Sequence, residues 1–188
     1  MICIFNQFLL QKISLRGINN YYKHSLPILY GLMVLIKDSV INDLIACQKI
    51  LNEPIHGLNY TRKHQFTRSV EAETELSSEH GEFKLRIRIN PIIENDFSVI
   101  LFWRDQDRKW RILTRYNGNS HTHTNVIEEN DISFVFHKHR LTERYQTIGK
   151  EEDYVEVATD YNNLETAINC IMHDCNISYS RRILDGYM

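Results

Sequence analysis

The segment Phe83–Ile89 constrains the fold more than any other part of this chain. Every second residue in it is apolar and every residue between is Lys or Arg, until Asn90-Pro91 ends the run. Side chains of a strand alternate between its two faces, so this pattern predicts a half-buried β-strand with one apolar and one charged face. A chain with such a strand needs a second layer that covers the apolar face of the sheet.

The neighbouring segments extend this strand into a meander. Residues 66–75 predict a first strand, and residues 97–103 are apolar on both faces, which is typical of a central strand. The polar turn 105–109 leads back into residues 110–116, so these two strands are expected to form a hairpin. Residues 132–137 alternate again and predict a further strand.

Two segments have the period of a helix instead. Ser39 is a suitable N-cap, and the apolar residues of 40–51 recur near every 3.6 residues until Pro54. Residues 164–176 have the same period. We therefore expect an α+β fold, in which an antiparallel sheet of about five strands is flanked by an N-terminal and a C-terminal helix.

The first 37 residues contain no Asp or Glu. This break in composition, together with an ordinary soluble start at Met33, predicts that residues 1–32 are an extension outside the domain and that residues 33–188 form a single α+β domain. The alternative is an N-terminal helix that packs on the domain. A secretory signal does not fit, because the n-region is uncharged and no small-residue cleavage site follows. Without residues 1–32, 19 basic residues stand against 24 acidic ones, so the domain carries −5.

Composition bounds the class of protein. With 43% hydrophobic residues and a formal charge of −2, the chain should fold and has no general attraction to nucleic acid. Its four cysteines form no disulfide framework, which favours a reducing, cytoplasmic setting. No run reaches the roughly 18 apolar residues of a membrane span. No phosphate-binding glycine loop, GxSxG or dinucleotide fingerprint is present, so we expect no cofactor of those classes.

The densest group of functional residue types lies between Gly118 and Gln146. It contains the pairs His121/His123 and His137/His139, and the members of each pair face the same way if their segments are extended. An imidazole near its usual pKa of about 6.5 accepts or donates a proton, as metal-free cleavage of an RNA phosphodiester requires. The pattern therefore predicts these four histidines as acid and base. Tyr145 is expected to orient the substrate or stack on it.

Four arginines complete the predicted site. Arg140 and Arg144 are one helical turn apart if the segment around Thr142 is helical, and their guanidinium groups would then fork onto phosphate oxygens. Arg111 and Arg115 are expected on one side of a strand that enters the same region. The alternative is that these arginines only pair with surface glutamates, where such pairs contribute little stability.

A metal is the competing use of the histidines. Two His-x-His pairs offer nitrogen ligands to zinc, but their spacing fits no zinc-finger or HExxH pattern and no carboxylate is an obvious partner. On that ground the site is predicted to be metal-free. Cys170, His173 and Cys175 also suggest ligands, although thiols buried beside a helix explain them better.

The motifs around the histidines resemble those of a known family. They are HxHxN at residues 121–125, HxHxxTERYQ at residues 137–146, and a tail over residues 169–176. In combination they resemble a family of uncharacterised prokaryotic proteins classed as a domain of unknown function, over about residues 33–177. The resemblance implies a bacterial, archaeal or phage origin and supplies no activity.

Two hypotheses follow from the sequence. The first is a metal-independent nuclease or RNA-phosphate-binding protein with a His/Arg/Tyr site, whose partner is RNA or another phosphate-bearing ligand. The second is a non-catalytic interaction protein, such as a regulator or inhibitor from a mobile element, whose acidic domain meets a protein partner. The sequence does not decide whether the protein is an enzyme.

Overall fold

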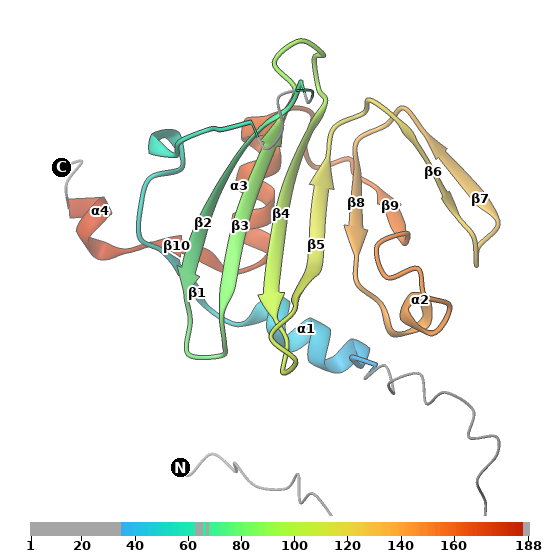
Figure 1. Cartoon of the computed structure of the whole chain (residues 1–188), viewed down its shortest axis with the longest axis horizontal. Helices are drawn as coiled ribbons and strands as arrows, with labels where there is room; N and C mark the ends of the chain where they lie inside the picture. The colour runs from blue at the N-terminus through green and yellow to red at the C-terminus, as the bar shows by residue number, and fades with distance from the viewer. Residues whose placement is uncertain (1–34, 63–65, 67, 186–188) are drawn as a thin grey trace, which may run out of the picture. The chain divides into compact units, whose positions relative to one another are not determined.

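In the computed structural model, which describes residues 35–62, 66 and 68–185, an eight-stranded sheet dominates the fold (Figure 1). The strand order is β10-β1-β2-β3-β4-β5-β8-β9, with β1 and β10 parallel and every other pair antiparallel. The strands of this sheet are β1 Lys49–Leu51, β2 Val70–Ser77, β3 Phe83–Ile89, β4 Phe97–Arg104, β5 Trp110–Asn117, β8 His137–Arg140, β9 Val155–Val157 and β10 Ile177–Tyr179. A separate hairpin consists of β6 (Thr122–Asn125) and β7 (Asn130–Ser133).

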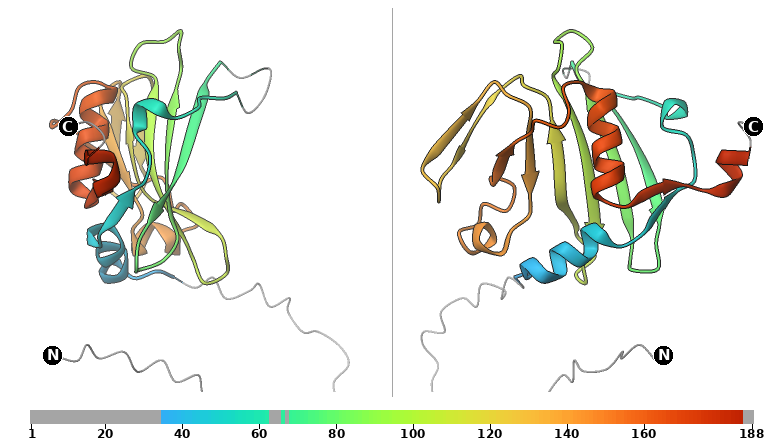
Figure 2. Two further views of the ribbon diagram at one scale, coloured as in Figure 1. Left: turned by 90° about the vertical axis from the view of Figure 1, so that its left-hand side faces the viewer. Right: turned by 180° about the vertical axis from the view of Figure 1, so that it is seen from behind.

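The helices make the fold two-layered. They are α1 Asp38–Ala46, α2 Glu143–Thr147, α3 Leu164–Asp174 and α4 Arg181–Asp185, with a 3-10 turn at Ile55–Gly57. Helix α3 lies across one face of the sheet, and α1 lies at the lower end of the same side (Figure 2). The apolar core fills the space beneath them, where Leu85, Leu101 and Ile171 are fully buried. The opposite face carries the alternating polar side chains of the strands.

The α+β class and a mostly antiparallel sheet are confirmed, whereas the expected number of strands is too small and α2 and α4 were not expected. Strand β3 has the predicted bounds, and the β4–β5 hairpin is also confirmed. Among the strands that the sequence does not reveal, β1, β9 and β10 have three residues each, which is too short to carry an alternating pattern.

Three predicted elements need correction. The first helix ends at Ala46 instead of continuing to Leu51, and Ser39 lies inside it. The first long strand covers Val70–Ser77 instead of residues 66–75. The predicted strand 132–137 is split, because Phe134 adopts a left-handed backbone with φ of 50° and so separates β7 from β8.

Lys49 explains why the first helix stops early. Its side chain is fully buried, and the ammonium group donates to the carbonyl oxygens of Ile45, Cys47 and Cys175 at 2.8–3.0 Å. The charge also lies 4.8 Å from the centre of the Phe83 ring. Burial lowers the pKa of Lys49. The ammonium group thus joins the C-terminal ends of α1 and α3, where helix carbonyls lack partners and carry negative charge.

The predicted extension, residues 1–32, lies outside the described residues. None of the helices in the described part of the chain combines the length and apolarity that crossing a bilayer requires.

Replacing Lys49 with Met tests the role of this contact. The substitution keeps the length of the side chain and leaves three carbonyl oxygens without a donor, so we expect the free energy of unfolding to fall by about 2–4 kcal/mol. Chemical denaturation measures the loss. Lys109→Met in the exposed β4–β5 turn is the matched control and should change stability by less than about 0.5 kcal/mol. Equal stabilities of the two variants would contradict this assignment.

Candidate metal centre

The candidate site begins on the face of the sheet that α3 does not cover. There β8 pairs with β5, and the register sets His137 opposite Asn117 and His139 opposite Arg115. The neighbouring residue, Lys138, points to the other face and contacts Asp174 of α3. Period two in β8 therefore places both histidines together on the polar face, as the sequence predicts.

The hairpin β6–β7 brings the second pair of histidines onto the same place. His121 leads into β6, and His123 lies within it. The hairpin is held by Asn125, whose buried side chain donates to the carbonyl oxygen of Val155 at 2.7 Å and accepts from its N–H at 2.9 Å. This amide replaces a pair of strand hydrogen bonds and joins the hairpin to β9.

Gly118 permits the sharp exit from β5 into this hairpin. A side-chain carbon at this position would lie 1.6 Å from the carbonyl oxygen of Asn95, so no other residue fits without movement of the backbone. The Gly118 N–H donates to the carbonyl oxygen of Phe97 at 3.1 Å.

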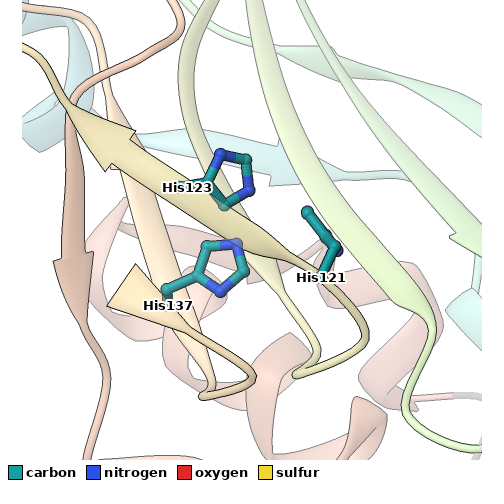
Figure 3. A group of neighbouring side chains, drawn as sticks. All are labelled: His121, His123 and His137. Atoms are coloured by element: carbon teal, nitrogen blue, oxygen red, sulfur yellow. The ribbon is translucent and has the colours of Figure 1, made fainter. Parts of the chain in front are cut away.

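The four imidazole rings form one cluster. Ring centres lie 4.6 Å apart for His121 and His123, 4.6 Å for His123 and His137, and 5.1 Å for His121 and His137. The ligand nitrogens of these three residues lie within 4.8 Å of one another. Figure 3 shows the three rings gathered in one place, from β6, from β8 and from the segment before β6. Of the described residues, these three form the one group with the composition and spacing of a metal site.

Hydrogen bonds fix the orientation of two of these rings. His137 Nδ1 lies 2.7 Å from the carbonyl oxygen of Val135, which only accepts, so Nδ1 carries the proton. His121 Nδ1 lies 3.1 Å from the Ser120 hydroxyl, which itself donates to Asp96, so this Nδ1 also carries a proton. His121 is then left with a lone pair on Nε2, whereas the Nε2 lone pair of His137 accepts a hydrogen bond from the side-chain amide of Asn117 at 3.2 Å. Metal-binding histidines are commonly held in this way by an acceptor on the other nitrogen.

Two buried polar atoms beside these rings have no hydrogen-bond partner among the described residues. One is Nε2 of His123 and the other is Oδ1 of Asn117. Asn117 also donates its amide N–H to Nε2 of His137 at 3.2 Å. Unsatisfied buried polar atoms are costly, so two of them on residues of this cluster favour a site for a ligand.

His139 belongs to the cluster but not to the group of three. Its ring packs on that of His123 with centres 4.4 Å apart. Nδ1 lies 2.6 Å from the carbonyl oxygen of Glu152 and carries the proton, and Nε2 lies 3.2 Å from Nη2 of Arg115. His139 thus supports the ring of His123 and orients the guanidinium group of Arg115.

All four histidines are held neutral. Burial lowers the pKa of His123 and of His137 to about 4 and that of His139 to about 2, and the charge of Arg115 adds to each shift. Burial also lowers the pKa of His121. At neutral pH these rings offer lone pairs and carry no positive charge, which is the form that binds a metal ion.

The other predicted site residues lie elsewhere, with one exception. A bulge at Leu113 offsets the alternation of β5, so Arg111 pairs with Trp103 and Arg115 with Ile100, on opposite faces of the sheet. The expectation that both arginines share one side is therefore wrong, and only Arg115 reaches the histidines. Arg111 instead pairs with acidic groups away from the cluster, namely Asp105 and Glu151.

Arg140 and Arg144 are not one helical turn apart, because Arg140 is the last residue of β8 and α2 begins only at Glu143. Arg140 contacts the side chain of Asn42, and Arg144 pairs with Glu128. The predicted phosphate fork is not formed by these two residues.

Tyr145 is buried in the core, and its hydroxyl donates to Glu128 at 2.6 Å. Other residues of the TERYQ motif also have structural contacts. The hydroxyl of Thr142 accepts from the Tyr145 N–H and caps α2, and the buried amide of Gln146 exchanges hydrogen bonds with the backbone of Ile36. In the described part of the chain this motif thus joins α2 to the segment before α1.

Sequence reasoning missed Asn117, Ser120 and Asp96 as site residues. Asn117 is the last residue of β5, and Asp96 comes from the separate β3–β4 connection. A local motif does not reveal these roles. Asn117 faces His137 through the strand register, and Asp96 contacts Ser120, which is 24 residues away in the sequence.

Comparison of the chain with protein-family models, with curated proteins and with solved structures gave no match.

Asn125→Ala tests whether the hairpin positions the site. The change removes both hydrogen bonds to Val155 and leaves two buried backbone groups unpaired, so the free energy of unfolding should fall by about 1–3 kcal/mol. Asn130→Ala, at the exposed end of the same hairpin, is the control and should be nearly neutral. NMR shifts of His121 and His123 should change in the first variant only, and unchanged shifts there would refute the role of Asn125.

The lowered pKa values predict a pH dependence of stability in the metal-free protein. The unfolded chain binds protons near the usual pKa of about 6.5, whereas folded His137 binds one only near pH 4. Stability is therefore complete above pH 6.5 and falls as the pH drops toward 4, by up to about 3 kcal/mol from His137 alone. Denaturation in the presence of a chelator at several pH values measures the loss. A His137→Gln variant should show a shallower slope, and a flat profile of the parent protein would contradict the prediction.

Proposed function

We propose that this chain binds one divalent transition-metal ion, zinc in the first place, through His121, His123 and His137. The observation that carries the proposal is the convergence of three neutral imidazoles whose ligand nitrogens lie within 4.8 Å. Zinc brings nitrogen ligands to 2.0–2.1 Å, so its ligands lie roughly 3.4 Å apart in a tetrahedral centre. A small inward movement of the hairpin rings would reach that spacing.

The donor set favours zinc and related ions over magnesium or calcium. Imidazole suits zinc, copper, iron and nickel, whereas magnesium and calcium prefer oxygen ligands. The carboxylate of Asp96 acts through Ser120 on the outer nitrogen of His121. It therefore orients a ligand ring, as the outer groups of metal sites commonly do.

Three protein ligands leave one coordination position for water, which is the arrangement of catalytic zinc sites. A bound zinc ion lowers the pKa of such a water toward 7 and supplies a hydroxide nucleophile. An ion on Nε2 of His137 would displace the amide N–H of Asn117 that this nitrogen now accepts, and the Asn117 side chain would then be available to hydrogen-bond the water. The proposed function is accordingly metal-dependent hydrolysis.

The pKa values support a metal over metal-free acid–base cleavage by the same histidines. Cleavage of that kind needs one imidazolium as the acid at neutral pH. With pKa values of about 4, His123 and His137 are protonated in roughly one molecule in a thousand at pH 7. Under this proposal the substrate of the nuclease hypothesis stays RNA or another phosphate-bearing ligand. The mechanism changes from metal-independent to metal-dependent cleavage. The alternative of a non-catalytic interaction protein stays a prediction.

Metal titration of the purified, chelator-treated full chain tests the proposal. We expect one equivalent of Zn²⁺ to bind in calorimetry, and Co²⁺ to give the visible absorption of a tetrahedral nitrogen site. His123→Ala should lower the affinity at least a hundredfold, because it removes one of three ligands. His80→Ala, in the exposed β2–β3 turn, is the matched control.

Circular dichroism of His123→Ala shows whether this variant is folded. The conservative variant His123→Gln should also bind Zn²⁺ more weakly than the parent. The proposal fails if the parent chain binds no metal, or if all these variants bind Zn²⁺ with the affinity of the parent.

A further inference from the structure

The arginines around the site differ in how completely they are neutralised. Most have a close acidic or amide partner, and these are Arg88 with Asp96, Arg111 with Asp105 and Glu151, Arg140 with Asn42, and Arg144 with Glu128. Arg115 has only Glu152, at 3.5 Å, and that carboxylate is 53% exposed. Within the described part of the chain, Arg115 and Arg140 are the two of these five without a close acidic partner, and of the two only Arg115 contacts a histidine of the cluster.

The guanidinium group of Arg115 is also short of hydrogen-bond acceptors. Its side chain is 21% exposed, and the buried Nε has no partner among the described residues. Nη2 lies 3.3 Å from Nδ1 and 3.2 Å from Nε2 of His139, but Nδ1 donates to the backbone carbonyl oxygen of Glu152, so only Nε2 accepts. An Arg carries five N–H donors, and several of these remain available.

Arg115 lies against the proposed metal centre. Its guanidinium group touches His139, whose ring packs on that of the ligand His123 with centres 4.4 Å apart. A metal ion at the three histidines and the guanidinium group would therefore be two cations in one partly buried place.

Two such cations repel each other, and the repulsion is strong where water is excluded. An anion between them reverses the sign of the interaction, because each cation then faces negative charge. The free Nε–H, the available Nη donors and the open coordination position of the ion all point to the same ligand type, an oxyanion with several oxygens.

We propose that the site binds a phosphate group, with one oxygen on the metal ion and another on the guanidinium fork of Arg115. This inference rests on the proposed function and adds the substrate class, a phosphate ester. A tetrahedral phosphate has oxygens for both contacts, and the fork of Arg matches two of its oxygens. Glu152, which is half exposed, moves aside as the phosphate takes over Arg115.

Calorimetry with inorganic phosphate on the Zn²⁺-loaded full chain tests the inference. Arg115→Gln should reduce phosphate affinity at least tenfold and still bind Zn²⁺ at least as tightly as the parent, since a neighbouring positive charge is removed. Arg115→Lys keeps the positive charge but loses the two-pronged guanidinium group, so its phosphate affinity should lie between that of the parent and that of Arg115→Gln. Arg108→Gln in the exposed β4–β5 turn is the matched control. Broadening of the phosphorus NMR signal by Co²⁺-loaded protein reports that the phosphate lies at the metal.

Parallel titrations with a nucleoside monophosphate and with a short RNA compare two sources of the phosphate group. Tighter binding of the RNA assigns a polynucleotide, and equal binding of all three probes assigns the phosphate group alone. A titration with acetate tests whether the site prefers phosphate to a carboxylate. Acetate binding as tight as that of phosphate would overturn the choice of phosphate.

The failures of the two proposals are distinguishable. Zn²⁺ loading without phosphate binding, or phosphate binding that Arg115→Gln and Arg115→Lys leave unchanged, overturns this inference and leaves the metal site standing. If the parent chain does not load Zn²⁺, the metal site fails. Arg115-dependent phosphate binding to the metal-free chain would then support only the contact with Arg115.

Discussion

The backbone pairing of β5 with β8 is the interaction on which the histidine cluster depends. It sets His137 beside Asn117 and His139 beside Arg115, on the face of the sheet that α3 leaves uncovered. A shift of this register by one residue would turn both histidines toward α3 and bring Lys138, which pairs with Asp174, onto the polar face. The acidic partners of Lys138 on the α3 side oppose such a shift, so the helical layer and the site stabilise the same register.

Burial explains both the cost of the cluster and its chemistry. Imidazoles on an exposed strand keep a pKa near 6.5, whereas the hairpin and the sheet enclose His137 and His139 and favour their neutral forms. The same enclosure gathers the imidazole rings and leaves Nε2 of His123 without a partner among the described residues. An environment of this kind weakens a histidine as an acid and improves it as a metal ligand.

The sequence predicts the parts of the molecule that local periodicity controls. It predicts β3, the β4–β5 hairpin, α3 and the two pairs His121/His123 and His137/His139, because each follows from a repeat of 2 or 3.6 residues. It does not predict the bulge at Leu113, which places Arg111 and Arg115 on opposite faces. Nor does it predict a three-histidine group, because His121 and His137 meet only through strand register and the docking of a hairpin.

The proposed ligands come from two parts of the fold, and this has a thermodynamic consequence. His137 belongs to the sheet, whereas His121 and His123 arrive with the β6–β7 hairpin, which Asn125 joins to β9. An ion that binds all three residues binds only the docked hairpin. It therefore stabilises docking by RT ln(1 + [M]/Kd), which is roughly 4 kcal/mol at a thousandfold excess over Kd. By the same linkage, any contact that holds the hairpin on the sheet strengthens metal binding, so the amide of Asn125 contributes to the site without touching the ion.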